Sequence, residues 1–253
     1  MAQTLKERLV RKLSPHLKSR IRARLHQFGL LTPRRAERLI LSAVALDGAR
    51  TFLQIGVNDG QYADPLNLAV HRGYLTGALV EPQPVFFRAM QQTYRGIAGM
   101  DYINKAISDQ AGTLPFYAFD PADPVIPAWA HGSASLDRAQ LMRFADRIPD
   151  VDRRIVEIPV ELVTVDQLLR ETRHANPDIL VVDAEGHDAR ILRQFDLTTF
   201  RPKLILYEEE SMSPDDASDI RKRFTDAGYE LRAMGQDSAA IRGDTQLAKA
   251  PAP

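Results

Sequence analysis

The sequence contains no cysteine among its 253 residues. This absence excludes disulfide bonds, thiolate nucleophiles and zinc or iron–sulfur sites held by cysteine. The sequence also has no apolar run of about 18 residues or more, which is the length that a membrane-spanning helix requires. The basic N-terminus is not followed by the apolar stretch of a signal peptide. We therefore expect a cytoplasmic protein.

The composition that is present favours a packed core. Apolar residues make up 44% of the chain and charged residues 26%, proportions that are typical of globular domains and not of disordered chains. The length suits one large α/β domain with a short appendage.

The formal net charge of zero hides an uneven distribution. Residues 1–35 carry ten Lys or Arg residues and a single acid, Glu7, so the remaining chain has a net charge of −9. A basic segment of this kind can contact anionic lipid, nucleic acid or an acidic protein surface. We expect no nucleic-acid partner here.

Residues 1–48 are predicted to form a basic, amphipathic helical arm. One apolar stripe recurs at steps of three or four residues: Leu5, Leu9, Leu13, Leu17, Ile21, Leu25 and Phe28. Pro15 should interrupt the helix, with Ser14 capping a second piece. Two interpretations are open. The arm either lies on a membrane, attaching the protein peripherally to the inner membrane face, or docks on the body or on a second subunit in a homodimer, with its basic face in solvent.

From residue 51 onward, short apolar runs alternate with helical segments. The predicted strands are 51–55, 78–81, 102–107, 179–183 and 204–208, and the predicted helices are 65–72, 84–94, 186–195 and 214–227. This alternation indicates a mostly parallel sheet with helices on both faces. Two closing strands, at 229–234 and 239–242, predict an antiparallel hairpin at the sheet edge.

We therefore expect a domain over residues 49–245, followed by a flexible tail at 246–253. Residues 110–165 interrupt the alternation with extra strands at 114–119 and 155–165. Insertions of this size often form lids or acceptor-binding loops, although a purely structural excursion is the alternative. Trp129, His131, Ser133 and Ser135 are candidate acceptor-site residues within it.

The first candidate for chemistry is the loop Gly56-Val57-Asn58-Asp59-Gly60, which follows the first predicted strand. Glycine permits positive φ and a close approach of the backbone to a ligand, and open α/β sheets bind ligands at the carboxyl ends of their strands. The loop is not G-x-G-x-x-G, which makes a dinucleotide site less favoured. An ordinary tight turn is the alternative.

Acidic residues end three further strands. Glu81 lies about 20 residues after the glycine loop, where an acid can accept hydrogen bonds from ribose hydroxyls. Asp183-Ala184-Glu185-Gly186-His187-Asp188 follows an apolar run, and Glu208 ends the next strand. Buried carboxylates are costly unless they are hydrogen-bonded, charge-paired, protonated or metal-bound. Capping of the following helices is the alternative role for these acids.

Together these motifs resemble the FkbM family of S-adenosylmethionine-dependent methyltransferases over about residues 50–242. The matching segments are Gly56–Gly60 for G-A-N-x-G, Glu81-Pro82 for E-P, Ala106–Asp109 for A-x-S-D, Gly132–Leu136 for G-x-S-S-L, Asp183–Asp188 for D-x-E-G-x-E, Glu208 for the acid after the fifth strand, and Gly228-Tyr229 for a late G-Y. The sequence departs from the family at three positions: Gln54 replaces an acid, Val181 replaces a lysine and Asp188 replaces a glutamate.

The resemblance implies a Rossmann-like class I methyltransferase fold with a seven-stranded, mostly parallel sheet. It implies a cofactor site for S-adenosyl-L-methionine formed by Gln54, Gly56, Asn58, Asp59, Gly60, Glu81, Pro82, Ala106, Ile107 and Asp183. It also implies methyl transfer to a hydroxyl of a saccharide, a glycolipid or a natural product.

A hydroxyl is a poor nucleophile at neutral pH, so its methylation needs a base or a metal. Asp183 is our first choice for the base and His187 the second, because histidine titrates near neutral pH. Glu185 and Glu208 complete the candidate catalytic set, and with Asp183 they could hold Mg²⁺. Two other functions remain open: a non-catalytic, cofactor-binding scaffold, or a different Rossmann-type nucleotide enzyme.

Overall fold

The computed structural model describes residues 13–127 and 129–251. Its centre is a seven-stranded sheet with the order β10-β11-β9-β8-β1-β2-β3. In that order the strands are Tyr229–Ala233, Asp237–Arg242, Leu204–Glu208, Ile179–Val182, Thr51–Ile55, Thr76–Val80 and Asp101–Ile103. Only β11 runs antiparallel to its neighbours in this sheet, because it closes the hairpin with β10 and inserts between β10 and β9. The predicted α/β class with a mostly parallel seven-stranded sheet is confirmed.

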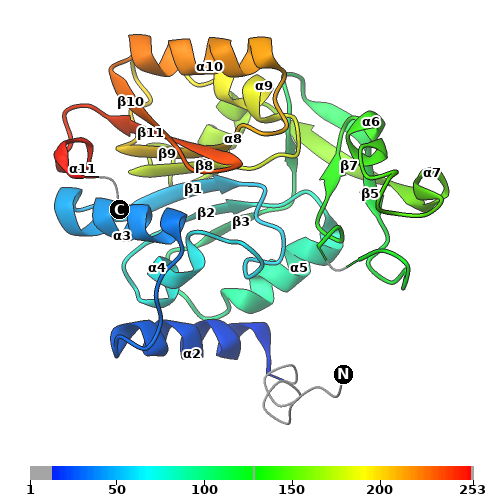
Figure 1. Cartoon of the computed structure of the whole chain (residues 1–253), viewed down its shortest axis with the longest axis horizontal. Coiled ribbons are helices and arrows are strands. Elements are labelled where there is room, and N and C mark those ends of the chain that lie inside the picture. The colour runs from blue at the N-terminus through cyan, green and yellow to red at the C-terminus, as the bar shows by residue number, and fades with distance from the viewer. Residues whose placement is uncertain (1–12, 128, 252–253) are drawn as a thin grey trace.

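Helices cover both faces of this sheet (Figure 1). The helices on one face are α8 (Val165–Glu171), α9 (Asp188–Arg193) and α10 (Pro214–Asp226), and those on the other are α3 (Arg35–Asp47), α4 (Asn67–His71) and α5 (Pro84–Thr93). Side chains alternate along each strand, so that Leu53 packs with α8–α10 while Phe52 packs with α3–α5. The strands read as continuous apolar runs because both of their faces are buried.

The carboxyl ends of β1, β2 and β8 meet at one rim of the sheet. The ladder continues just beyond each strand: Gly56 N donates to Val80 O, Glu81 N to Ile103 O and Asp183 N to Ile55 O, at 2.9 to 3.0 Å. The residues that follow the strands are therefore fixed relative to one another by backbone hydrogen bonds.

The insertion forms a second sheet beside this rim. Its order is β4-β7-β5-β6, and its strands are, in that order, Ala106–Ile107, Ile155–Val163, Gly112–Phe119 and Ala134–Ser135. Two short helices, α6 (Arg138–Met142) and α7 (Val151–Arg154), complete it. The extra strands predicted at 114–119 and 155–165 are present as the long antiparallel pair β5 and β7.

The single strand predicted at 102–107 is wrong, since it is two strands in two sheets. β3 ends the large sheet and β4 begins the small one. Asn104 lies between them, and its side-chain amide donates to the carbonyls of Glu81 and Pro82 at 2.8 and 3.0 Å. This contact with the turn after β2 redirects the chain from one sheet to the other.

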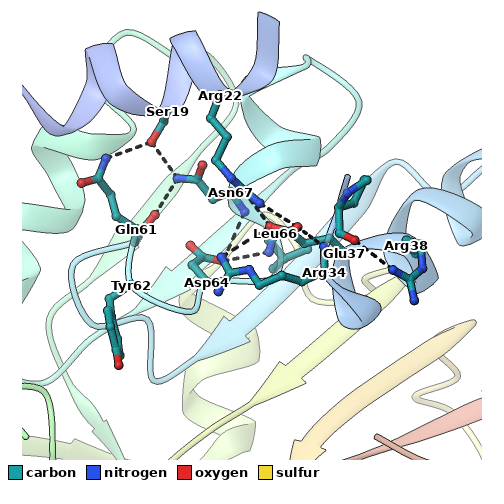
Figure 2. A network of polar contacts seen from close by, with 12 residues as sticks. Ser19, Arg22, Arg34, Glu37, Arg38, Gln61, Tyr62, Asp64, Leu66 and Asn67 are labelled. Carbon is teal, nitrogen blue, oxygen red and sulfur yellow. Dashed lines mark hydrogen bonds and ion pairs between the residues drawn. The ribbon is translucent and has the colours of Figure 1, made fainter. Parts of the chain in front are cut away.

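The described part of the arm contains α2 (Pro15–Gln27), which docks on α4 and α5. Figure 2 shows the contact: Ser19 accepts from the side-chain amides of Gln61 and Asn67 at 3.1 and 3.0 Å, and Arg22 reaches Glu37 at 2.6 Å. α2 therefore docks on the body, and contact of the arm with a membrane or with a second subunit stays a prediction. The predicted stripe residues Leu5 and Leu9 lie outside the described residues.

The prediction of a flexible tail at residues 246–253 is wrong for its first four residues. Residues 246–249 form α11 (Gln246–Lys249), Thr245 caps this helix through its side chain, and Leu247 is buried against α3. An apolar residue after a capping threonine explains why this segment packs. Within residues 13–127 and 129–251, no helix is both long enough and apolar enough to cross a bilayer.

Candidate active site

Two adjoining cavities open at the rim where the parallel strands end. The first lies over β2 and the turn into β4, and its walls include Glu81, Gln83, Ala106, Ile107 and Phe116. The second lies over β8, β9 and β11, and its walls include Gln54, Asp64, Trp129, Glu208 and Asp237. Both cavities share Gly56, Asn58, Gly132, Asp183 and Glu185. One elongated ligand could therefore extend from the first into the second.

Gly56 is the residue that brings β1 closest to β8 at this rim. Its φ is +80°, and a Cβ atom placed on it would lie 1.7 Å from the carbonyl oxygen of Asp183. No residue with a side chain fits at this position, between the loop after β1 and the loop after β8. The backbone of Gly56 forms part of the cavity wall. Packing against the Asp183 backbone explains the glycine at this position, and the approach of its backbone to a ligand stays a prediction.

The carboxylate of Glu81 fixes the glycine loop after β1 by accepting hydrogen bonds from backbone N–H groups. One carboxylate oxygen accepts the backbone N–H of Asn58 at 2.7 Å, and the other accepts that of Gln83 at 2.9 Å. Burial raises the pKa of Glu81 to about 7, against the lowering effect of these hydrogen bonds. Each carboxylate oxygen has a second lone pair, so both can also accept a ligand hydroxyl from the first cavity.

Gln54 faces the second cavity from the middle of the sheet. It is 2% exposed, and its Oε1 atom is buried with no hydrogen-bond partner among the described residues. A buried acceptor without a partner costs roughly 1–3 kcal/mol. A cationic or N–H-bearing group of a ligand would recover this cost.

Asp183 connects the two cavities and is surrounded by other acids. Its side chain is exposed, and since it lines both cavities, this exposed surface faces them. The pKa of Asp183 lies well above the ordinary range, first because the walls of the two cavities hold much of the bulk water away from the carboxylate and then because Asp188, Glu208, Glu185 and Asp237 carry like charges. A carboxylate with a raised pKa is a stronger base.

Glu185 is held against the insertion. Arg143, which follows α6, donates to its carboxylate at 2.6 Å, and the hydroxyl of Ser135 donates to its backbone carbonyl at 3.1 Å. Its φ of +48° is unusual for a residue with a side chain. Burial and then the charge of Glu208 raise the pKa of Glu185 to about 7. The acidic loop and the insertion are thus tied together at the cavity.

The other members of this acidic loop differ in placement. His187 lines the first cavity, and burial lowers its pKa, which favours the neutral imidazole. Asp188 is fully buried, and both of its carboxylate oxygens lie 3.2 Å from the backbone N–H of Ala184. Asp188 therefore stabilises the loop that precedes α9 and not the N-terminus of that helix, which has no side-chain cap, so the capping role expected for these acids is not seen at this residue.

Not every predicted site residue reaches a cavity. Asp59 accepts the N–H groups of Gln61 and Tyr62 at 2.8 Å, and Gly60 packs against Tyr94, so both shape the turn and line neither cavity. His131 also lines neither, because its ring bonds to Ile126 O at 2.9 Å. Pro82 and His187 line the first cavity, and Trp129 and Ser133 line the second.

The sequence pointed to a possible magnesium site at Asp183, Glu185 and Glu208. In the part of the chain that the structure describes, no group of three or more His, Asp or Glu side chains is arranged to hold a metal ion. The Arg143 guanidinium already pairs with Glu185. The structure therefore gives the magnesium prediction no support.

Sequence reasoning missed two residues of the site. Gln83 lines the first cavity with a buried, unpartnered Oε1 atom, while its amide donates to Gly132 O at 3.2 Å. Its position two residues after Glu81 was a usable signal. Arg143 pairs with Glu185 across 42 residues of sequence, and no local pattern indicates such a contact.

The chain matches the model of the methyltransferase FkbM domain over residues 54–231. A search of curated proteins finds no match. Three similar solved structures are a fibrillarin, an O-methyltransferase and a precorrin methyltransferase. Fibrillarin from Aeropyrum pernix, with natively bound S-adenosyl-L-methionine, has 15% identity and a TM-score of 0.38, covering 82% of this chain and 75% of that chain.

The second, the O-methyltransferase from Bacillus cereus in complex with S-adenosylhomocysteine, has 14% identity and a TM-score of 0.39, covering 91% of each chain. The third, the precorrin-6y C5,15-methyltransferase from Geobacter metallireducens, has 11% identity and a TM-score of 0.37, covering 81% of this chain and 82% of that one. The family match spans most of the chain and contains every residue shared by the two cavities. The chain therefore belongs to the FkbM family and is an S-adenosylmethionine-dependent methyltransferase.

Proposed function

We propose that this methyltransferase acts on a hydroxyl oxygen, with adenosine in the first cavity and the methionine part of the cofactor in the second. The observation that carries the proposal is the arrangement around Asp183. This residue lies where the cavities meet and has a raised pKa. A base at that point adjoins both a bound cofactor and an acceptor.

The residues present fit S-adenosylmethionine. Glu81 has free lone pairs for two ribose hydroxyls, and the apolar side chains of Ala106, Ile107 and Phe116 provide walls for a flat base. The unpartnered Oε1 of Gln54 suits the ammonium of the methionine part. A neutral amide lacks the charge attraction of the acid that the family has here, and the acids nearby in the second cavity supply negative charge in its place.

When bound, the cofactor supplies an electrophilic methyl group on a positively charged sulfur. The protein then has to align an acceptor oxygen with the S–CH₃ bond and remove the hydroxyl proton. Asp183 takes that proton as the C–O bond forms and the C–S bond breaks. Its acidic neighbours assist, because they raise its pKa and so its affinity for the proton. His187 faces the first cavity only, which favours Asp183 over His187 as the base.

The acceptor is proposed to be a sugar hydroxyl, with a glycolipid or a natural product as the wider class. Exposed aromatic rings of Tyr62 and Trp129 lie at the second cavity and can pack against the apolar face of a sugar ring. The carboxylates in the same cavity accept hydrogen bonds from hydroxyls, and none of the described Lys or Arg residues lines it. We propose that residues 110–165, which contribute Trp129, act as the acceptor lid.

The test is methyl transfer from isotopically labelled S-adenosylmethionine to an extract of cell glycans and glycolipids, analysed by mass. We expect the label in an ether linkage on a neutral saccharide, and no transfer by the Asp183→Asn variant. Transfer to nitrogen or carbon, or to acidic acceptors in preference to neutral ones, would contradict the proposal. Cofactor binding without transfer to any hydroxylated acceptor would favour the alternative of a non-catalytic scaffold.

A further inference from the structure

α2 packs on the body with its polar face and leaves its apolar face exposed, which is the reverse of what is expected for a docked amphipathic helix. The face that packs on the body is small and polar, with Ser19 and Ala23 buried. The apolar stripe points away: Leu17, Ile21 and Leu25 are 39–40% exposed, and the stripe continues into Phe28 at 70% and Leu30 at 72%. An amphipathic helix normally buries its apolar stripe. Here nothing among the described residues covers it.

Basic side chains border the stripe on both sides. At about 100° per residue, Arg20 and Arg24 lie along one edge of the stripe and Lys18 along the other. Arg20 and Arg24 are exposed. The sequence has no acidic residue from 13 to 36. The surface formed by Leu17, Ile21, Leu25, Phe28 and Leu30 with these three bases is called the α2 stripe below.

We propose that the α2 stripe binds the surface of an anionic lipid membrane. Apolar side chains between cationic ones are the pattern by which a helix lies in a bilayer interface, its apolar face among the acyl chains and its charges at the headgroups. The bases attract anionic headgroups. The inference stands on the helix alone and does not depend on which acceptor is methylated.

Charge disfavours one other occupant of the α2 stripe, and its apolar side chains disfavour a second. A second copy of this chain that packed stripe against stripe would bring Lys18, Arg20 and Arg24 near their own counterparts, with no acid in the segment to neutralise them. Nucleic acid would match the charge but offers nothing to a row of leucine and isoleucine side chains, since bases stack on aromatic rings.

The helix is mounted rigidly enough to present this surface. Besides the contacts of Ser19 that Figure 2 shows, the Gln61 amide donates to Pro15 O at 2.6 Å, and a bond from Asn67 to Gly60 O at 2.6 Å fixes the Asn67 amide within the body. The Arg22–Glu37 pair ties the helix to α3. Turning the apolar stripe inward would break the bonds that Pro15, Ser19 and Arg22 make with the body, so the outward orientation is the stable one.

The experiment is co-sedimentation of the full chain with vesicles of phosphatidylcholine alone or mixed with phosphatidylglycerol. We expect binding to the mixed vesicles, little binding to the neutral ones, and release by salt. The Arg20→Gln/Arg24→Gln variant should bind the mixed vesicles about thirtyfold more weakly, at about 1 kcal/mol for each base.

A second variant, Ile21→Ser/Leu25→Ser, removes apolar surface and should weaken binding about tenfold or more. Leu114→Ser is the matched control, because Leu114 on β5 is 50% exposed and lies outside the stripe. Thermal unfolding shows that each variant is folded, and the substituted side chains of α2 are exposed enough to make this the expected result.

Three outcomes would overturn the proposal. The first is no binding of the wild-type chain to anionic vesicles. The second is equal loss of binding in Leu114→Ser. The third is a wild-type dimer in solution that Ile21→Ser/Leu25→Ser dissociates, which would assign the stripe to a second copy.

Discussion

The two cavities of the active site are built in different ways. Polar groups of the first are largely fixed by the protein itself, since both oxygens of Glu81 already accept backbone N–H groups. The second gathers acids from β8, β9 and β11. Each cavity also has one buried amide oxygen without a partner among the described residues, that of Gln83 in the first and that of Gln54 in the second. A preformed cavity suits a cofactor of constant shape, whereas a cavity of like charges holds groups with altered pKa values that can do chemistry.

The largest expected effect is in the second cavity. Asp183→Asn keeps the shape of the side chain and removes the base, so we expect turnover to fall by roughly 10²–10⁴-fold, with a much smaller loss of affinity for S-adenosylhomocysteine, whose sulfur carries no charge. Wild-type activity should rise with pH as Asp183 loses its proton, over a range above that of an ordinary carboxyl. Steady-state kinetics and calorimetry measure the two quantities, and Asp215→Asn, on the exposed start of α10, is the control. Equal losses of affinity and turnover would remove the distinction between the cavities.

Gly56→Ala tests the wall between the cavities. The new methyl group would overlap the Asp183 carbonyl, which lies 1.7 Å from the Cβ position. We expect loss of cofactor binding and a free energy of unfolding lower by roughly 3 kcal/mol, at the upper end for overpacking. Gly73→Ala is the matched control, because Gly73 also has a positive φ, of +71°, but nothing within 4 Å of its Cβ position. It should cost about 1–2 kcal/mol and leave binding intact. Similar behaviour of the two variants would show that only backbone strain matters.

A smaller effect is expected at Gln54. Gln54→Leu removes the unpartnered acceptor from the second cavity, and S-adenosylhomocysteine should bind about tenfold more weakly, the equivalent of one hydrogen bond to a charged group. Methylthioadenosine lacks the amino-acid part and should bind equally well to both proteins. A parallel loss for both ligands would mean that Gln54 acts on the shape of the site as a whole.

The smallest expected effect is the change in the free energy of unfolding with pH. Burial raises the pKa of Asp64 to about 6, and that of Glu81, Glu185 and Asp188 to about 7. Raised pKa values mean that the folded chain binds more protons than the unfolded chain, so stability is greatest below about pH 4 for these groups and is lost as the pH rises toward 7.

Urea unfolding at a series of pH values measures this trend. Glu81→Gln should flatten the curve by removing one of the four contributions, and each unit of pKa difference corresponds to about 1.4 kcal/mol. Stability that increases steadily from pH 4 to 7 would contradict these burial effects.

The fold and the first cavity were largely predictable from the sequence because their signals are local. A strand followed by Gly56, and another followed by Glu81, lie within short segments whose order fixes their place at the rim. Gln54 was recognisable as a departure, but only the structure shows that its oxygen has no partner.

The remaining features depend on long-range packing that no local pattern reveals. Arg143 reaches Glu185 because the insertion folds back over the rim. The helical period of α2 identifies its apolar stripe, but the period alone cannot show that Ser19 and not Leu17 faces the body. That choice follows from the amides of Gln61 and Asn67, which lie 42 and 48 residues away in sequence from Ser19.

The most direct test of the two-cavity account is a crystal structure of the chain with S-adenosylhomocysteine. We expect the ribose hydroxyls on Glu81, the amino group beside the Oε1 of Gln54, and the sulfur next to the Asp183 carboxylate. A cofactor bound in the reverse direction, or outside the two cavities, would contradict it.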